Sequence, residues 1–403
     1  MLSKLNLKEL FVFILFFFML FNNCLSNILP IFNYSDEIIT IILVLLTIYT
    51  TVKKKNNILK LFPKKSNEFK SIIFFLLFII IGIISTIFLR YEIQIIAIIK
   101  DIFSFSKFFI CYYCSLIVFD NEINSTYIIK FSKIIIFILF FLSIISQFVD
   151  LGMTHDVRMG IKSFKFLFVH PTFLVFTMVM LFCLVHLYKY SLKYEVMIFF
   201  IIFMTQRTKG FLFIVGVLAL MFVLNYFKKI KIKHIIVLGA LVLLLSSNKI
   251  LTYISAAQFS ARPLLYITAF QIMSNYFPLG TGFASFGTYT SAEYYSPLYY
   301  RYNLFYIEGL KPTSFGYIGD TFWPGLIGQF GMFGCISYIT SLFYIFRSSI
   351  GSIANNSRKY ESIIYTWLYI ILALFVETTL TNESGVFVAI FLVLIKKFKI
   401  VTT

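Results

Sequence analysis

Residues 71–89 read SIIFFLLFIIIGIISTIFL and contain no charged side chain. A helix needs about 20 apolar residues to cross the ~30 Å hydrocarbon core of a bilayer. Lipid offers no hydrogen-bond partner to the backbone, so a spanning segment must satisfy its own backbone groups as a helix does. This stretch therefore predicts a membrane-spanning helix.

The rest of the chain repeats this pattern. Of its 403 residues, 60% are hydrophobic and 13% are charged, which leaves too little polar surface for a soluble globule. Similar apolar segments lie at 10–32, 36–52, 71–89, 98–119, 134–150, 165–187, 194–206, 210–227, 234–253, 321–346, 362–380 and 385–396. We therefore expect an all-α, polytopic integral membrane protein with about twelve transmembrane helices, forming a single membrane domain over residues 1–403.

The formal net charge of +18 comes from lysines that gather in three places. These are Lys53, Lys54, Lys55, Lys60, Lys64, Lys65 and Lys70 in one loop, Lys228, Lys229, Lys231 and Lys233 in another, and Lys396, Lys397 and Lys399 near the end. Cytoplasmic loops carry an excess of Lys and Arg, so all three clusters and both termini are expected in the cytoplasm. This charge faces solvent and lipid headgroups, and we expect membrane lipid rather than nucleic acid as the partner.

The sequence gives no signal for a metal or cofactor. The five cysteines, including the pair Cys111 and Cys114, all lie in apolar segments and are interpreted as packing residues. The four histidines are scattered, with no i, i+4 spacing typical of a metal site. A Gly-rich phosphate-binding loop is also absent from the sequence. We therefore expect neither a metal nor a cofactor.

The apolar pattern stops in one region, residues 254–320. From Tyr253 to Phe322 the chain has eleven tyrosines, together with Arg262, Arg301, Lys311, Glu293, Glu308 and Asp320. The predicted topology makes 254–320 one large external loop between spans 9 and 10. A membrane protein with one large polar, aromatic loop is expected to act there.

Charges inside the segment 98–119 interrupt its apolar character. Lys100 and Lys107 are seven residues apart, so they share nearly the same helix face, and Asp101 lies beside the first. Ionisable groups at membrane depth cost ~2.5–3.5 kcal/mol on insertion scales. Either Asp101 neutralises one lysine while the other reaches the interface, or the two lysines form a cationic stripe for an anionic lipid headgroup.

Positive side chains on the predicted outer side need an explanation, because topology disfavours them there. They are Arg90, Arg158, Lys162, Lys165, Arg207, Lys209, Lys249, Arg262, Arg301 and Lys311. A guanidinium donates two parallel hydrogen bonds to a phosphate. Single cations could anchor to lipid headgroups, whereas several converging arginines would bind a pyrophosphate.

Several local patterns occur in a fixed order around the large loop, at residues 158–160 (RMG), 170–172 (HPT), 205–210 (TQRTKG), Arg262 with 278–283 (PLGTGF), and Asp320 with 331–334 (GMFG). In their order and placement they resemble the bacterial polysaccharide polymerase and O-antigen ligase superfamily. The similarity covers residues 158 to 335, and the N-terminal half agrees in span pattern only.

This resemblance implies a metal-independent glycosyltransferase of the bacterial cytoplasmic membrane. Its substrate would be a polyprenyl-pyrophosphate-linked oligosaccharide, joined at the outer face into an O-antigen, capsule or exopolysaccharide, with a chain-length regulator as a possible partner. Ligases of the superfamily usually have His-Asn where this chain has Asp320-Thr321. That difference favours a polymerase over a ligase. A lipid-linked oligosaccharide flippase is an alternative of another class, but it predicts two related halves, which this sequence lacks.

The expected site follows from the chemistry of glycosyl transfer. Arg262 and Arg207 are expected to stabilise the leaving pyrophosphate, and Asp320 to take the acceptor proton, with Glu293 or Glu308 in reserve. The substrate-binding residues are expected to be Arg158, Lys209, Arg301, Lys100, Lys107, Tyr299 and Tyr300. The alternatives are that Asp320 only caps the next helix and that the tyrosines belong to an interfacial belt or to the core of the loop.

Overall fold

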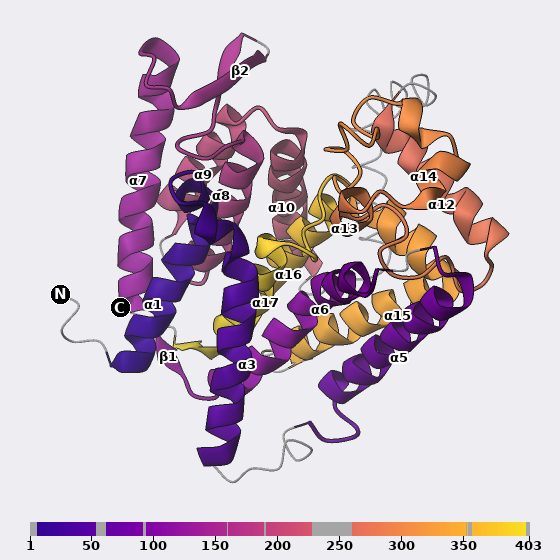
Figure 1. Cartoon of the computed structure of the whole chain (residues 1–403). Helices are drawn as coiled ribbons and strands as arrows, with labels where there is room; N and C mark the ends of the chain where they lie inside the picture. Colours follow the sequence, from indigo (N-terminus) through magenta and orange to yellow (C-terminus); the bar gives the residue numbers. More distant parts are fainter. Residues whose placement is uncertain are drawn as a thin grey trace.

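The computed structural model describes residues 6–53, 62–91, 94–158, 160–188, 191–227, 260–351, 353 and 357–399. Most of these residues are helical (Figure 1). The predicted span 234–253, the lysine cluster at 228–233, Lys249 and the first residues of the large loop lie outside the described residues. So do Lys54, Lys55 and Lys60 of the first cluster and Met159 of the RMG pattern.

Each predicted apolar segment within the described residues coincides with a helix. The longer helices are α1 (Leu7–Leu20), α3 (Ser35–Lys53), α5 (Asn67–Leu89), α6 (Ile95–Val118), α7 (Thr126–Phe148), α8 (Pro171–His186), α9 (Leu192–Met204), α10 (Thr208–Phe227), α12 (Ala261–Asn275), α15 (Phe322–Gly351), α16 (Ser357–Leu374) and α17 (Glu383–Lys397). Two short pieces, α2 (Asn22–Ser26) and η2 (Pro30–Tyr34), interrupt the first predicted segment.

The expected number of twelve spans is not met. Within the described ranges, four helices are long and apolar enough to cross a membrane: Pro30–Lys53, Asn67–Leu89, Thr126–Phe148 and Phe322–Gly351. Several other helices are too short, since α1, α8, α9 and α17 have 14, 16, 13 and 15 residues. In α6 the length is sufficient, but Lys100, Asp101 and Lys107 interrupt the apolar run.

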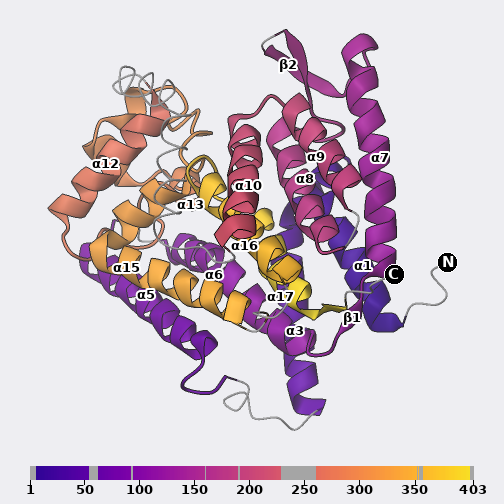
Figure 2. The same ribbon diagram turned by 180° about the vertical axis from the view of Figure 1, so that it is seen from behind.

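Helices α8 and α17 form the interior of the bundle. Almost every side chain of α8 is buried, and so is nearly all of α17. Figures 1 and 2 show α17 surrounded by other helices, and it contacts α1, α3, α6 and α16. By contrast, the perimeter helices leave apolar side chains exposed, such as Leu45 of α3, Ile87 of α5 and Phe137 of α7. Exposed apolar faces of this kind suit contact with lipid.

Two very short sheets accompany the helices, which departs in detail from the expected all-α class. Strands β1 (Ile123–Asn124) and β4 (Phe398–Lys399) pair in parallel. Strands β2 (Thr154–Arg158) and β3 (Ile161–Phe164) form an antiparallel hairpin in which Arg158 is opposite Ile161. The hairpin lies between the predicted apolar segments 134–150 and 165–187 and stands at the end of the bundle in Figure 1.

The start of α1 and the end of α17 lie close together, at the opposite end of the bundle from the hairpin. The ammonium of Lys8 lies 3.1 Å from the carboxylate of Asp120. Lys397 donates to the backbone carbonyl of Asp120 at 2.6 Å, and Lys396 donates to that of Ser348 at 2.9 Å. The described termini therefore come together, as Figure 1 also shows.

The described part of the large loop is a folded unit rather than an irregular excursion. It contains α12 followed by α13 (Tyr289–Glu293), α14 (Pro297–Arg301) and η3 (Leu304–Tyr306). Leu265, Phe286, Leu298, Tyr299 and Ile318 are among the buried residues of its own small hydrophobic core. Side chains on this unit are therefore held in defined positions.

The unit is joined to the bundle where α15 breaks. Gly331 has non-helical backbone angles (φ 57°, ψ −158°), which divide α15 into two helical parts. The loop backbone fills this break, because the N–H of Gly282 donates to the carbonyl of Gln329 at 2.7 Å. A Cβ at Gly280 would lie 2.4 Å from the nitrogen of Gly331, so glycine is required for this approach. The PLGTGF and GMFG patterns thus pack against each other.

Asp101 provides a second anchor for the same loop. Its side chain is buried in α6, and its Oδ2 accepts the backbone N–H of Ala284 at 2.7 Å. On α5, the hydroxyl of Thr86 accepts the N–H of Phe283 at 2.8 Å. The hydrogen-bond partner of Asp101 is thus the loop backbone, whereas the sequence suggested a neighbouring lysine.

Candidate functional site

Three side chains lie within hydrogen-bond distance of one carboxylate in the hairpin. Asp156 of β2 accepts from Nε of Arg158 at 2.6 Å and from Nη2 of Arg207 at 2.7 Å. Nδ1 of His155 lies 3.1 Å from the same carboxylate. Burial alone would raise the pKa of Asp156, but the hydrogen bonds from Arg158 and His155 and the charge of Arg207 hold this pKa well below its ordinary value.

Arg207 is the buried member of this group. It lies in the turn between α9 and α10, and only 8% of its side chain is exposed. Its Nε has no hydrogen-bond partner among the described residues. An unsatisfied buried guanidinium N–H is costly. The arrangement therefore favours an anion that accepts this hydrogen bond.

His170, at the start of α8, also belongs to this group. Its Nδ1 accepts the backbone N–H of Thr172 at 3.3 Å and so caps the helix, and Pro171 occupies the first helical position. Its ring centroid lies 5.1 Å from that of His155. Burial, followed by the positive charge of Arg207, lowers the pKa of His170 from 6.5 to about 4. His170 is therefore neutral at physiological pH.

Lys209 adds a further cation, two residues after Arg207. Its side chain is 5% exposed and its ammonium forms an ion pair with Glu377. The same ammonium donates to the hydroxyl of Tyr369 on α16 at 3.2 Å. We refer to His155, Asp156, Arg158, His170, Arg207 and Lys209 together as the Asp156 cluster.

Arg262 and Asp320 form a second polar group, on the loop unit. Oδ2 of Asp320 accepts from both Nη2 and Nε of Arg262, at 2.6 and 3.2 Å. About a third of each side chain is exposed. On the same helix, the hydroxyl of Tyr266 donates to the carbonyl of Phe375 at 3.4 Å. Since Glu377 pairs with Lys209, the segment 375–377 contacts both the loop unit and the Asp156 cluster.

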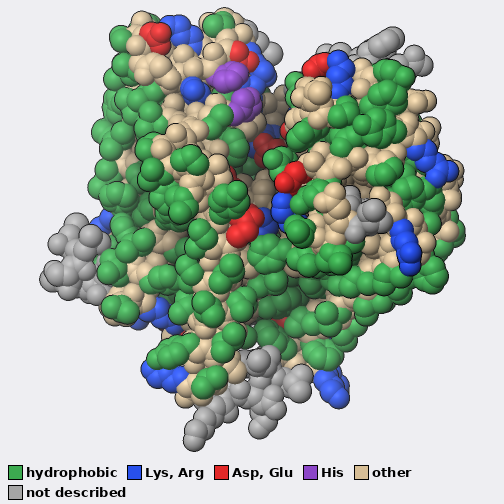
Figure 3. Space-filling view, in the orientation of Figure 1, with side chains coloured by type: hydrophobic (Ala, Val, Ile, Leu, Met, Phe, Trp, Pro, Cys, Tyr) green, Lys and Arg blue, Asp and Glu red, His purple; other side chains and the backbone are tan. Residues whose placement is uncertain are grey.

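The molecular surface is hollowed between these two parts. Figure 3 shows the hollow between the bundle helices that carry the hairpin and the loop unit. Histidine side chains lie at its edge, and acidic and basic side chains gather along it. A polar ligand could therefore contact residues of both parts at once.

The structure does not bring the two lysines of α6 together. Lys100 pairs with Glu293 of the loop unit at 3.0 Å, with both side chains partly exposed. Lys107 is buried between two carboxylates of α3, pairing closely with Asp36 and at 3.1 Å with Glu37. Each lysine thus has its own partner, and the cationic stripe along α6 is not formed.

The remaining expected residues lie on the loop unit. Nη1 of Arg301 donates to the hydroxyls of Tyr91 and Tyr276, at 2.5 and 2.6 Å. Tyr299 is fully buried, and its hydroxyl accepts the N–H of Gly287 at 2.8 Å, so it belongs to the core of the unit. Tyr300 is 51% exposed and can contact a ligand.

Sequence reasoning missed several members of the Asp156 cluster. His155 was considered only as a scattered histidine, His170 was also named in the HPT pattern, and Asp156 was not considered, although His155 and Asp156 lie just before Arg158. That adjacency was the available signal. Glu377 gave no signal, because its partner Lys209 is distant in the sequence.

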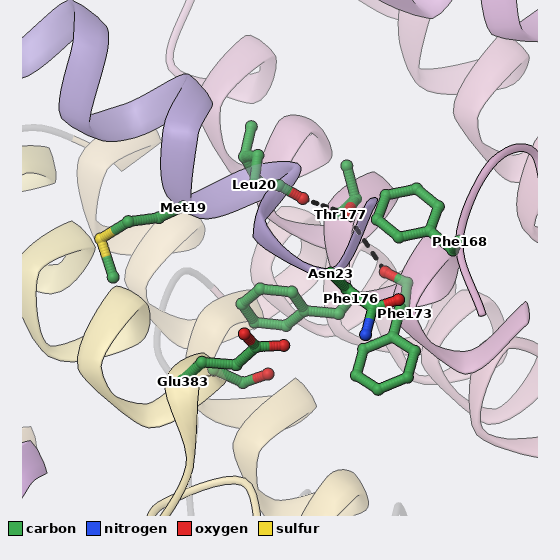
Figure 4. A pocket seen from close by; sticks show the side chains of 9 residues that line it. Met19, Leu20, Asn23, Phe168, Phe173, Phe176, Thr177 and Glu383 are labelled. Atoms are coloured by element: carbon green, nitrogen blue, oxygen red, sulfur yellow. Dashed lines mark hydrogen bonds between the residues drawn. The ribbon is translucent and has the colours of Figure 1, made fainter. Parts of the chain in front are cut away.

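A small cavity lies close to His170, between α1, α8 and α17. Phe168, Phe173 and Phe176 line it together with Glu383 and Asn23, as Figure 4 shows. Its free volume of about 10 Å³ is enough for about one water molecule. The cavity is therefore too small for a sugar.

Comparison with known proteins adds no assignment: no protein-family model and no curated protein matches this chain. Over the described ranges, no group of three or more His, Cys, Asp or Glu side chains is placed to hold a metal ion. The functional argument therefore depends on the geometry of the site and on the sequence patterns.

Proposed function

We propose that this chain spans the bacterial cytoplasmic membrane and joins polyprenyl-pyrophosphate-linked oligosaccharide repeat units into a surface polysaccharide at the outer face. The observation that carries the proposal is the buried guanidinium of Arg207, with an unused N–H, beside Arg158 and Lys209. The order of sequence patterns around the large loop supports the same superfamily.

In this proposal, the leaving pyrophosphate binds at the Asp156 cluster. Negative charge grows on the pyrophosphate as the sugar is transferred, and preorganised cationic donors stabilise this charge in the transition state. Asp156 holds Arg158 and Arg207 in place before the substrate arrives. Arg262, on the other side of the hollow, supplies a guanidinium from the loop unit.

The first experiment is the glycan phenotype of a deletion strain. Single repeat units left on the lipid carrier at the outer face are expected for a polymerase. Full-length polymer that stays unattached would instead indicate a ligase, and units retained in the cytoplasm would indicate a flippase. Either of these outcomes would contradict the proposal.

The second experiment tests Arg207 in the purified protein with lipid-linked repeat units as substrate. Arg207→Ala should reduce polymer formation by ~10²-fold or more, the usual effect of removing one transition-state donor. Arg207→Lys should restore little, because a lysine cannot donate two parallel hydrogen bonds. Arg347→Ala is the control, since Arg347 is exposed and lies over the ring of Phe343. Equal activity of Arg207→Ala and the control would remove Arg207 from the site.

A further inference from the structure

His155 and Asp156 form a pair with the geometry of a general base and its orienting carboxylate. Nδ1 of His155 lies 3.1 Å from Oδ1 of Asp156. An ionised carboxylate only accepts hydrogen bonds, so Nδ1 must carry the proton and donate it. In the neutral imidazole, Nε2 then holds a free lone pair. The side chain of His155 is 42% exposed, so Nε2 can be reached from solvent.

The neighbouring histidine has the opposite tautomer. Nδ1 of His170 accepts the backbone N–H of Thr172, so its neutral ring carries the proton on Nε2. His170 can therefore donate a hydrogen bond into the cluster but has no free nitrogen to accept a proton. Of the two rings, His155 is the one able to act as a base.

Asp320, which the sequence analysis expected to take the proton, is already hydrogen-bonded in the structure. Oδ2 of Asp320 accepts two N–H groups from Arg262. Around His155, the charged and titratable neighbours are Asp156, Arg158, His170 and Arg207. Asp156 is the acidic member of that group, and its charge would stabilise an imidazolium formed on His155.

We propose that His155 is the general base of the transfer reaction and that Asp156 is its positioning residue; this inference rests on the proposed function. The acceptor hydroxyl oxygen attacks the anomeric carbon of the donor sugar and forms the new C–O bond. The bond from that carbon to the pyrophosphate oxygen breaks, and its electron pair leaves with the polyprenyl pyrophosphate. The hydroxyl proton passes to Nε2 of His155.

The test compares purified variants with lipid-linked repeat units. His155→Gln should lower kcat by ~10²–10⁴-fold with little change in KM, because glutamine is polar and similar in length but cannot accept the proton. Added imidazole should restore part of the activity of His155→Gly, since the site is half-open to solvent. Asp320→Asn should lower kcat much less, because the carboxylate of Asp320 is paired with Arg262 and takes no proton in this mechanism.

Rescue by imidazole separates catalysis from structure. A loss of activity that came only from disturbed packing in His155→Gly would not respond to added imidazole.

Two outcomes have distinct meanings. If the wild type polymerises the substrate and His155→Gln has a similar kcat, the general-base role is wrong while the proposed function stands. If the wild type does not polymerise the substrate, the proposed function fails and this inference fails with it. Unchanged extraction yield and gel-filtration elution of the variants verify that they are folded.

Discussion

His170 shows how one residue links helix capping to the charge of the site. It caps α8 through Nδ1 and lies within the electrostatic influence of Arg207, His155, Lys209 and Asp156. Its location in a cationic, partly buried group disfavours the imidazolium form. The same cationic environment that favours an anionic substrate therefore keeps this ring neutral.

The lowered pKa of His170 predicts a pH dependence of stability. Its ordinary pKa of 6.5 falls to about 4 in the folded protein. Between these values the unfolded chain binds a proton that the folded protein does not, so the free energy of unfolding should fall as the pH drops from about 6.5 to about 4. Below pH 4 both states are protonated and this contribution stays constant.

Thermal unfolding in detergent, measured from pH 4 to pH 7.5, checks this expectation. His170→Asn is the informative variant, because asparagine also caps a helix N-terminus but does not titrate. The difference in stability between wild type and variant should change in favour of the variant toward acid pH. A constant difference across this range would show that His170 is not responsible.

At the scale of elements, the decisive contact is between the loop backbone and the break in α15. Gly280 has a φ of +73° and faces the nitrogen of Gly331. Both the backbone angle and the space require glycine. The position of the loop unit, and hence of Arg262, depends on this contact.

Gly280→Ala should therefore destabilise the protein by about 1–3 kcal/mol, the typical cost of a strained backbone position. Gly316→Ala is the matched control, because a Cβ there meets nothing within 4 Å. It should change stability by less than about 0.5 kcal/mol. The free energy of unfolding of both variants is measured by denaturation in the same detergent. Equal stability of the two variants would contradict the packing described for Gly280.

The positions of the helices along the chain could be predicted from the sequence, whereas the helices that pack against each of them could not. An apolar run such as 71–89 is a local property, and it coincides with α5. Burial of the whole of α17 depends on neighbours from distant parts of the chain, and its composition resembles that of a perimeter helix. The count of twelve spans failed for the same reason, because helices enclosed by protein can be shorter than a bilayer-facing helix.

Part of the Asp156 cluster could be selected from the sequence. Arg158, Arg207 and Lys209 were selected singly, and the structure brings them together. Their counter-ions Asp156 and Glu377 were not selected, since Arg207 lies far from Asp156 in the sequence and Lys209 lies far from Glu377. Helical spacing placed Lys107 on nearly the same face as Lys100, but it could not show that the carboxylates of α3 pair with Lys107.

At the scale of the whole molecule, the proposed orientation puts the hairpin and loop unit outside and the lysine-bearing ends inside. A cysteine at Glu308, whose side chain is 72% exposed, should react with a membrane-impermeant maleimide on intact cells. A cysteine at Lys64 should react only after the membrane is opened. Both are introduced into a variant that lacks the five native cysteines. Labelling at Lys64 but not at Glu308 in intact cells would reverse the orientation.

Because α17 lies inside the bundle, the order in which the helices are synthesised affects how the bundle assembles. The helices that it contacts, α1, α3, α6, α15 and α16, all precede it in the chain. While the ribosome is still making α16, the inner faces of α1, α3 and α6 lack the helix that fills the space between them. The Asp36–Lys107 ion pair, which joins α3 to α6 next to that space, can hold the two helices together in the interval. Packing of α17 against these helices then fills the space between them.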